Sequence, residues 1–300
     1  MQNVFYIVGP TASGKSELAA EVAARLDAEI VSADAFQIYE GLPLLTAKPD
    51  ADILSLAPHH VINAVPLREE MNAERFRQLA LQAIDAIRAK GKPVLVVGGS
   101  GLYVKALSDG LSPLPPADQK LRAQLDQLST RELFVRLSAL DPERARRIEA
   151  QNKRRLLRAV EICLLTGRPA SAQRAAPASK PHRGVLVFRD RPELYERINS
   201  RVEAMFIMGV EDEVRAYPTV SASAAQALGL RQIRDLLAGR ISEAECIASI
   251  QQATRRYAKR QLTWFSRQTN FEPLNLSLRG SAEAIEEITR KARLSFADRE

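Results

Sequence analysis

Residues 9–16, which read GPTASGKS, restrict the fold of this chain more than any other stretch. They follow the apolar run VFYIV of residues 4–8 and lead into KSELAAEVAARLD, which has the pattern of an amphipathic helix. A glycine-rich turn of the form G-x-x-x-x-G-K-[ST] between a strand and a helix is a phosphate-binding loop, or P-loop, and it occurs in parallel α/β sheets. The sequence therefore predicts a parallel sheet with a P-loop after its first strand.

Further strand-like and helix-like segments alternate over the first hundred residues. AEIVSAD at residues 28–34 and KPVLVVGGSG at residues 92–101 read as strands, and residues 73–91 read as a helix that ends at a glycine cap. The second of these strands is continuously apolar, as are strands buried on both faces of a parallel sheet. We predict an α/β fold of P-loop type, with a doubly wound parallel sheet as its core.

The pattern changes at residues 112–118, which read SPLPPAD. Helical patterns follow to about residue 170, and an Ala- and Pro-rich connection leads to the strand-like segment GVLVFRD at residues 184–190. We therefore predict a P-loop α/β core with C-terminal helices at residues 1–115 and 184–300, interrupted by a helical insertion domain at residues 116–183.

Charge clustering bears on the partners of the chain. The net charge is +7 over 300 residues, and residues 143–158 hold seven Lys or Arg against two Glu. A second basic segment, without acidic residues, spans residues 254–267. Such clustering favours a nucleic-acid partner, while a basic surface without that role is the alternative.

Composition argues against several other classes of protein. No stretch approaches about 18 apolar residues, so no membrane span is expected. Cys163 and Cys246 lie far apart and the chain has only three histidines, so neither a disulfide framework nor a zinc site is expected. A cytoplasmic protein fits these features best, and a monomer is expected because no interface signature stands out.

The P-loop residues have the chemistry of a phosphate site. Gly9 and Gly14 allow the main chain to turn its N–H groups toward an anion. Lys15 supplies a positive charge, and the Ser16 hydroxyl can bind Mg²⁺. An ATPase would add an acidic residue at the end of another apolar strand, but residues 94–97 are followed by GGSG. That difference weakens the ATPase hypothesis and leaves a small kinase open.

Two more polar residues follow apolar strands. Asp34 ends the second predicted strand, and Ser100 follows residues 94–97. Because ligands bind beyond the carboxyl ends of parallel strands, we expect Asp34, Ser100 and the P-loop to converge on one crevice. Asp34 would act there as a general base or a metal ligand, or, as the structural alternative, it caps a turn.

Several segments together resemble one known family. Beside GPTASGKS they are VSADAFQIY (31–39), TAKP (46–49), VVGGSGLYVKAL (96–107), RRLLRAVEI (154–162), RPELYERINSRVEAMFIMGVEDEV (191–214), QALGLRQI (226–233) and TRRYAKRQLTWF (254–265). Over nearly its whole length the chain is thereby similar to the tRNA dimethylallyltransferases of bacterial type, also called tRNA isopentenyltransferases.

The resemblance implies a reaction. A dimethylallyl group would pass from dimethylallyl diphosphate to N6 of the adenosine directly 3′ of the anticodon (position 37), in tRNAs that read UNN codons, and diphosphate would be released. The P-loop would then hold the diphosphate leaving group rather than a nucleotide, with Mg²⁺ as the cofactor.

The resemblance also implies roles for individual residues. Asp34 and Ser100 would be catalytic, and Ser16 would hold the metal. The residues expected to bind the diphosphate are Gly9, Thr11, Ala12, Ser13, Gly14, Lys15, Ser16 and Arg201. The residues expected to bind the tRNA anticodon stem-loop are Asp34, Ala35, Phe36, Gln37, Ser100, Arg122, Arg154, Arg155, Arg158, Gln226, Arg231, Arg255 and Lys259.

Three residues depart from the family pattern. Ala35 stands where relatives usually carry Ser, Leu45 stands where Gly is usual, and Leu230 replaces an aromatic residue. These departures affect the expected details of tRNA contact and not the expected reaction.

Other functions remain open from the residues alone. A P-loop kinase for a small molecule, an adenylate isopentenyltransferase acting on free AMP, and a protein that only binds RNA are the alternatives. Trp264 and Phe265 in the second basic segment either stack on bases or belong to the hydrophobic core.

Overall fold

The computed structural model describes residues 3–172 and 183–297 of the 300-residue chain. The chain divides into two units, one formed by residues 1–108 and 179–300 and the other by residues 109–178. The predicted insertion includes residues 173–182, which lie outside the described residues.

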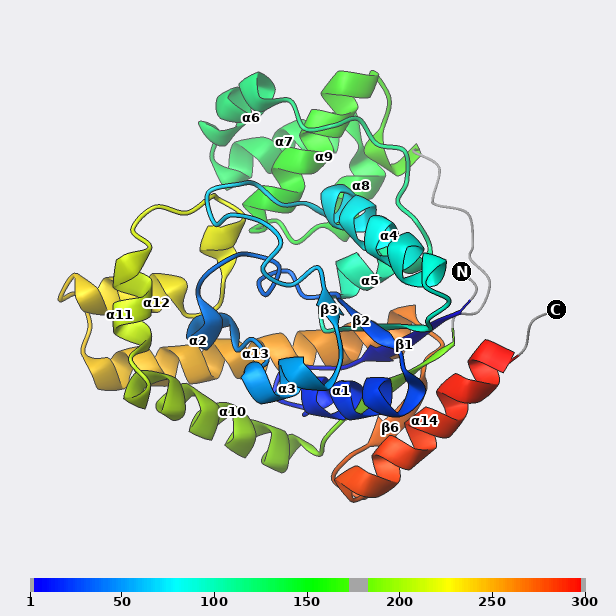
Figure 1. The fold of residues 1–300 in the computed structure, drawn as a ribbon. Helices are drawn as coiled ribbons and strands as arrows, with labels where there is room; N and C mark the ends of the chain where they lie inside the picture. The colour runs from blue at the N-terminus through cyan, green and yellow to red at the C-terminus, as the bar shows by residue number, and fades with distance from the viewer. Residues whose placement is uncertain (1–2, 173–182, 298–300) are drawn as a thin grey trace. The chain divides into compact units, whose positions relative to one another are not determined.

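A six-stranded sheet forms the centre of the first unit (Figure 1). The strands are β1 (Val4–Val8), β2 (Glu29–Ser32), β3 (His59–His60), β4 (Val94–Gly98), β5 (Gly184–Phe188) and β6 (Glu272–Asn275). Their order across the sheet is β3-β2-β4-β1-β5-β6, and all the neighbouring pairs run parallel. This arrangement confirms the predicted α/β fold with a parallel sheet and puts the end of β1, where the P-loop begins, between the ends of β4 and β5.

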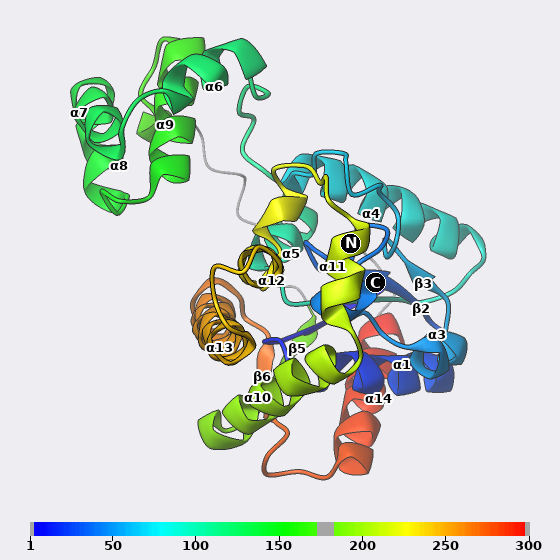
Figure 2. The ribbon, with the colours of Figure 1, turned by 90° about the vertical axis from the view of Figure 1, so that its left-hand side faces the viewer.

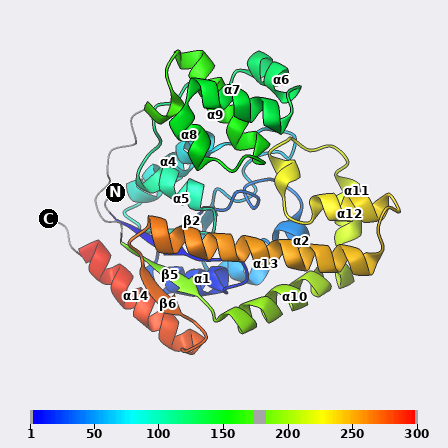
Figure 3. The ribbon, with the colours of Figure 1, turned by 180° about the vertical axis from the view of Figure 1, so that it is seen from behind.

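Alternating side chains of the strands build two hydrophobic cores. In β1, Phe5 and Ile7 belong to one core, while Tyr6 belongs to the other. Helices cover both faces, as a doubly wound sheet requires (Figures 1 and 3). The covering helices are α1 (Lys15–Leu26) and α14 (Ser281–Ala297) on the first face, and α4 (Ala73–Ala89) and α5 (Gly101–Ser108) on the second.

A group of C-terminal helices completes the first unit. They are α10 (Arg191–Ile207), α11 (Val210–Ala216), α12 (Leu230–Leu237) and α13 (Glu243–Gln268), with a short 3₁₀ turn at Ala224–Gln226. The 26-residue α13 packs against α10 and α12 (Figure 2). It begins at a capping box formed by Ser242 and Glu245, and it contains the second basic segment. Two short helices, α2 (Pro43–Thr46) and α3 (Ala51–Leu56), lie in the connection between β2 and β3.

Every regular element described in the second unit is a helix, and the unit appears in green in Figure 1. Its helices are α6 (Gln119–Asp126), α7 (Thr130–Leu140), α8 (Pro142–Arg147) and α9 (Lys153–Thr166), followed by a 3₁₀ turn at Ala170–Ala172. Each α-helix begins at a side chain that accepts a hydrogen bond from the first turn, namely Asp118, Ser129, Asp141 and Asn152. Buried leucines such as Leu133 and Leu156 form its own core.

Other features bear on the class of protein. Across the described ranges, each helix is too short or too polar to cross a lipid bilayer. Cys163 and Cys246 are both buried and unpaired. Within the same ranges, no three residues among His, Cys, Asp and Glu are grouped so that they would hold a metal ion by themselves.

Candidate functional site

The P-loop has the conformation of an anion-binding turn. Gly14 has φ = +89°, a left-handed conformation that residues with a side chain rarely adopt, and it directly precedes α1. Gly9 lies so close to β5 that a Cβ atom added to it would be 2.2 Å from the carbonyl oxygen of Val187. Both glycines are therefore required by the geometry. The first residues of α1 line a polar cleft, where the helix N-terminus attracts negative charge.

Lys15 adds a partly shielded cation to this cleft. Burial lowers the pKa of Lys15, while the nearby Asp34 carboxylate opposes that effect. The Lys15 ammonium donates to the carbonyl oxygen of Pro10 at 3.4 Å, a weak bond that leaves it able to bind a ligand. Ser13 is fully buried, and its Oγ has no hydrogen-bond partner among the described residues.

Three arginines hold three successive residues of the P-loop. Arg201 Nη1 lies 3.2 Å from Thr11 Oγ1, Arg197 Nε donates to the carbonyl oxygen of Ala12 at 2.9 Å, and Arg189 Nε donates to that of Ser13 at 2.9 Å. Burial lowers the pKa of Arg201, whereas Asp34 acts in the opposite direction. The sequence pointed to Arg201 but not to Arg189, because nothing local to Arg189 indicates a P-loop contact.

Asp34 both caps a turn and lines the candidate site. Its Oδ1 accepts hydrogen bonds from the main-chain N–H groups of Phe36 at 2.9 Å and Gln37 at 3.2 Å. Asp34 therefore caps a turn, which the sequence analysis gave as the alternative to a catalytic or metal-binding role. Asp34 also lines the cleft together with Lys15 and Arg201, so the cap fixes a carboxylate beside two cations.

Ser100 lies behind Asp34 and supports the same turn. It is 8% exposed, and its Oγ accepts a hydrogen bond from the Ala35 amide at 2.8 Å. The Tyr257 hydroxyl hydrogen-bonds with Ser100, and burial raises the pKa of Tyr257 well above its usual value. Ser100 is not among the residues that line the apolar cavity described below, whereas Asp34 and Tyr257 are.

Gln261 of α13 joins the P-loop to the end of β4. The main-chain N–H of Thr11 donates to Gln261 Oε1 at 2.9 Å, and Gln261 Nε2 donates to the carbonyl oxygen of Gly99 at 2.8 Å. Gln261 is 5% exposed. It lies within the quoted segment TRRYAKRQLTWF, which was the only sequence signal for it.

The segment around α2 is tied down by two charged side chains. The Glu213 carboxylate accepts hydrogen bonds from the N–H groups of Leu44 at 2.7 Å and Leu45 at 2.8 Å. The Lys48 ammonium donates to the carbonyl oxygen of Gly41 at 2.6 Å, and burial lowers the pKa of Lys48 to about 8. The TAKP motif therefore stabilises the loop that carries Leu45 into the site.

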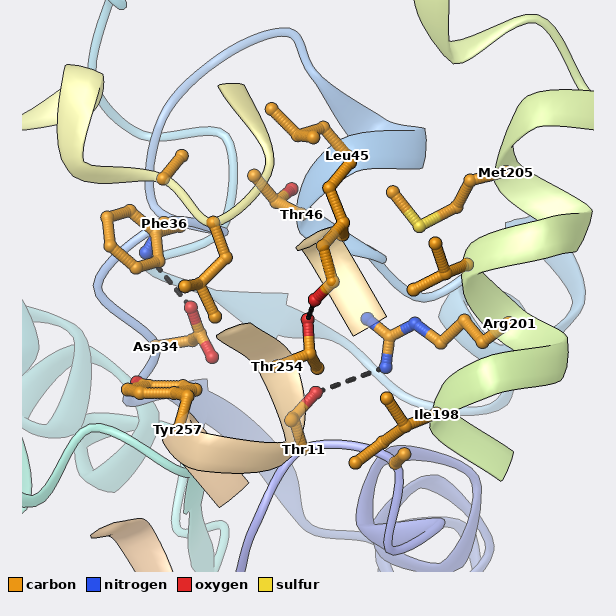
Figure 4. A pocket seen from close by; sticks show the side chains of 15 residues that line it. Thr11, Asp34, Phe36, Leu45, Thr46, Ile198, Arg201, Met205, Thr254 and Tyr257 are labelled. Atoms are coloured by element: carbon orange, nitrogen blue, oxygen red, sulfur yellow. Dashed lines mark hydrogen bonds between the residues drawn. The ribbon is translucent and has the colours of Figure 1, made fainter. Parts of the chain in front are cut away.

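An apolar cavity opens beside the polar cleft. Figure 4 shows Thr11, Asp34 and Arg201 at one part of it, with Leu45 and Met205 well away from Thr11. Its other apolar lining residues include Phe36, Ile198, Val202, Leu228 and Ile250. Because Thr11, Asp34 and Arg201 also line the polar cleft, the two spaces share a wall. The arrangement suits a ligand with one anionic and one hydrocarbon part.

The predicted tRNA contacts in the second unit differ in their surroundings. Arg154 and Arg155 are exposed on the first turn of α9. Arg122 and Arg158 instead form ion pairs with the fully buried Glu161, at 2.9 Å and 2.6 Å. Hydrogen bonds from Arg122 and Arg158 help to hold the pKa of Glu161 below its usual value, although burial alone would raise it. The sequence showed Arg158 as part of the basic cluster at residues 143–158, and it indicated Arg122 only through the family resemblance.

The remaining predicted tRNA contacts lie in the first unit. Gln226, Arg231 and Lys259 are exposed. Arg255 Nη1 donates to Asn199 Oδ1 at 2.6 Å, and Gln37 Nε2 donates to the carbonyl oxygen of Ala47 at 2.8 Å. Arg255 and Gln37 are therefore already engaged within the protein, whereas the other three point to solvent.

The aromatic residues of the second basic segment belong to the core. Phe265 is fully buried, and Trp264 packs against it edge-to-face with ring centroids 5.0 Å apart. A Cβ atom on Gly101 would be 2.4 Å from the Trp264 ring, so the indole also covers the start of α5. These contacts favour the core assignment over stacking on bases.

The chain is a P-loop α/β protein in which a cationic cleft beside the P-loop adjoins an apolar cavity. The IPP transferase family matches residues 37–268. The tRNA dimethylallyltransferase of Akkermansia muciniphila is 43% identical over 283 residues, which cover 94% of this chain and 96% of that protein. A tRNA dimethylallyltransferase 1 of Citrifermentans bemidjiense is 42% identical over 275 residues, which cover 89% of this chain and 90% of that one.

A solved structure gives the same result. The full-length tRNA isopentenylpyrophosphate transferase of Bacillus halodurans is 32% identical and superposes with a TM-score of 0.72, and the match covers 98% of each chain. The chain belongs to the IPP transferase family, as the resemblance in its sequence predicted.

Proposed function

We propose that this protein transfers a dimethylallyl group from dimethylallyl diphosphate to N6 of adenosine 37 in tRNAs that read UNN codons. The observation that carries the proposal is the wall shared by the polar cleft and the apolar cavity, formed by Thr11, Asp34 and Arg201. The diphosphate group of a prenyl diphosphate suits the polar cleft, and its hydrocarbon part suits the apolar cavity. The identity of about 40% to tRNA dimethylallyltransferases over most of the chain supports the same reaction.

Departure of the diphosphate is the step that the P-loop supports. Negative charge accumulates on the leaving oxygens as the bond to the allylic carbon breaks. The N–H groups at the start of α1, the Lys15 ammonium and the Arg201 guanidinium are already oriented toward the cleft before the ligand arrives. Preoriented donors stabilise developing charge without reorganisation, and this is the main contribution that we assign to Thr11, Lys15 and Arg201.

Attack by the adenine amine is the step that Asp34 supports. Its Oδ1 is occupied by the N–H groups of Phe36 and Gln37. We assign Oδ2 to bind the adenine amine that receives the prenyl group. Oδ2 accepts a hydrogen bond from this amine and then takes its proton as the new C–N bond forms. Ser100 binds the Ala35 amide, so we propose that it supports the turn that carries Asp34 and acts on the reaction only through that turn.

The cleft also fits a magnesium ion. Ser16 and Asp34 both line one small cavity, which offers a hydroxyl and a carboxylate as oxygen ligands. Mg²⁺ prefers oxygen ligands and keeps several waters, and it is commonly completed by substrate phosphates. When bound, Mg²⁺ supplies further neutralisation of the diphosphate, and Ser16 is the residue that we assign to hold it.

We assign tRNA binding to exposed basic residues on both units. They are Arg154 and Arg155 on α9, Arg231 on α12 and Lys259 on α13. The insertion that the sequence predicts at residues 116–183 would then be a tRNA-binding domain. Contacts of this kind with phosphates make affinity fall steeply with salt.

The direct test is turnover of Asp34→Asn with Mg²⁺, dimethylallyl diphosphate and unmodified tRNA. We expect turnover to fall at least about tenfold, as for loss of a general base, while the dissociation constant for tRNA stays close to that of the wild type. Asp52→Asn, which changes an exposed carboxylate in α3, is the matched control and should behave as wild type. Near-normal turnover of Asp34→Asn would remove Asp34 from the mechanism.

Parallel assays with AMP or ATP test two other activities. Prenylation of AMP in preference to tRNA would indicate an adenylate isopentenyltransferase. Phosphoryl transfer from ATP without an effect of tRNA would indicate a small kinase, although the end of β4 carries Gly98, Gly99 and Ser100 where a metal-binding acid would be expected.

A further inference from the structure

Arg189 makes a contact with the P-loop that neither motif nor composition indicates. It follows β5 directly, and β5 pairs with β1, the strand that leads into the P-loop. Its side chain is only 14% exposed. Nε donates to the carbonyl oxygen of Ser13 at 2.9 Å, and Nη1 lies 3.3 Å from the carbonyl oxygen of Leu276. The guanidinium thus connects the P-loop to the segment after β6.

A carboxylate holds Arg189 in this position. Glu193 Oε1 accepts from Arg189 Nη1 at 2.5 Å, and Glu193 Oε2 accepts from Ser277 Oγ at 2.5 Å. The hydrogen bond from Ser277, together with the charge of Arg189, keeps the pKa of Glu193 below its usual value, so the carboxylate is ionised at neutral pH. Ser277, Glu193, Arg189 and the Ser13 carbonyl form one continuous chain of hydrogen bonds.

The hydrogen bonds of Arg189 affect the ligand site through the peptide bond between Ser13 and Gly14. A trans peptide is planar, and its C=O and N–H groups point in opposite directions. When Arg189 draws the Ser13 carbonyl to its side, the Gly14 N–H is directed to the other side. Gly14 lines the polar cleft, so that N–H is available to a bound anion.

We propose that Arg189 is a positioning residue for the diphosphate site, which orients the Ser13–Gly14 peptide so that the Gly14 N–H faces the anion. The proposal rests on the proposed function for the identity of the donor substrate. The requirement for an oriented peptide holds for any diphosphate in the cleft.

The test compares Arg189→Gln, Arg189→Lys and wild type in two assays. The first is binding of inorganic diphosphate with Mg²⁺ to the full chain without tRNA, by calorimetry. The second is transfer, with KM measured separately for dimethylallyl diphosphate and for tRNA. The matched control is Arg191→Gln, since Arg191 is an exposed arginine two residues away whose guanidinium lies 5.1 Å from the centre of the Tyr195 ring.

We expect Arg189→Gln to weaken diphosphate binding and raise KM for dimethylallyl diphosphate by about tenfold or more, as for loss of an ordered charge-assisted contact. KM for tRNA should change less than about twofold, and Arg191→Gln should match the wild type in both assays. Arg189→Lys retains one donor for the Ser13 carbonyl and should recover part of the loss. Glu193→Gln should show a smaller change in the same direction.

Two results would overturn the inference. One is diphosphate binding by Arg189→Gln that equals the wild type. The other is a uniform loss, in which both KM values change alike, thermal stability falls and lysine restores nothing, because that pattern belongs to a purely structural residue. If the wild type bound diphosphate but transferred no prenyl group, the proposed function would fail while the binding assay still tested Arg189.

Discussion

Replacing Gln261 with leucine removes the side chain that joins the P-loop to the end of β4. Gln261 is almost fully buried and makes two hydrogen bonds to main-chain groups, the Thr11 N–H at 2.9 Å and the Gly99 carbonyl at 2.8 Å. Leucine has no polar atom and its side chain is one carbon shorter. Two main-chain groups are thereby left without these partners.

The expected decrease in the free energy of unfolding follows from the Thr11 N–H and the Gly99 carbonyl. A buried polar group that loses its partner costs about 1–3 kcal/mol, so the pair sets a range of about 2–6 kcal/mol. Thr11 is partly exposed and its N–H regains water, which favours the lower half of that range, about 2–4 kcal/mol. At about 2–4 °C per kcal/mol for a domain of this size, the melting temperature should fall by about 4–16 °C.

Thermal unfolding followed by circular dichroism measures this effect. Gln252→Leu is the matched control, because Gln252 lies on the same helix and is exposed. The control should melt within about 1 °C of the wild type, as surface substitutions do. If Gln261→Leu also melted within about 1 °C of the wild type, the reasoning that Gln261 fastens the P-loop would be refuted.

Two further predictions concern stability. Hydrogen bonds from His60 and Lys90 hold the pKa of Glu29 below its usual value despite its burial. The contribution of Glu29 to the free energy of unfolding is therefore present above about pH 4.5 and is lost as pH falls through the lowered pKa. Glu29→Gln should flatten the acid limb of a stability–pH profile, and an unchanged profile would contradict this. A Cβ on Gly98 would be 2.2 Å from the carbonyl oxygen of Ala33, so Gly98→Ala should lower the free energy of unfolding in urea by at least about 1–3 kcal/mol. In the control Gly280→Ala the added atom meets open space and the change should be small. Equal urea midpoints for the two variants would contradict the packing argument.

Local features of the fold could be predicted from the sequence because local physics determines them. The P-loop follows from its glycines and from the strand and helix around it, and the helix at residues 73–91 matches Ala73–Ala89 with a left-handed Gly91 after it. The continuous apolar run at residues 94–97 correctly indicated a strand buried on both faces.

The contacts that shape the site could not be predicted, because they join residues far apart in the chain. Arg189 and Ser13 are 176 residues apart, and Gln261 and Thr11 are 250 apart. Arg122 appeared as a basic residue suited to tRNA, whereas its pairing with the buried Glu161 depends on how α6 and α9 pack. Charge patterns indicate the kind of partner, but burial decides which charges are exposed to it.

The central claim is that this chain prenylates tRNA, and nucleoside analysis tests it most directly. Unmodified tRNA carrying A-A-A beside its anticodon is incubated with Mg²⁺, dimethylallyl diphosphate and the protein, digested to nucleosides and examined by mass spectrometry. We predict N6-dimethylallyladenosine in the sample with wild-type protein and its absence when the protein is omitted. If no such nucleoside formed with any tRNA of this kind, the proposed function would be wrong.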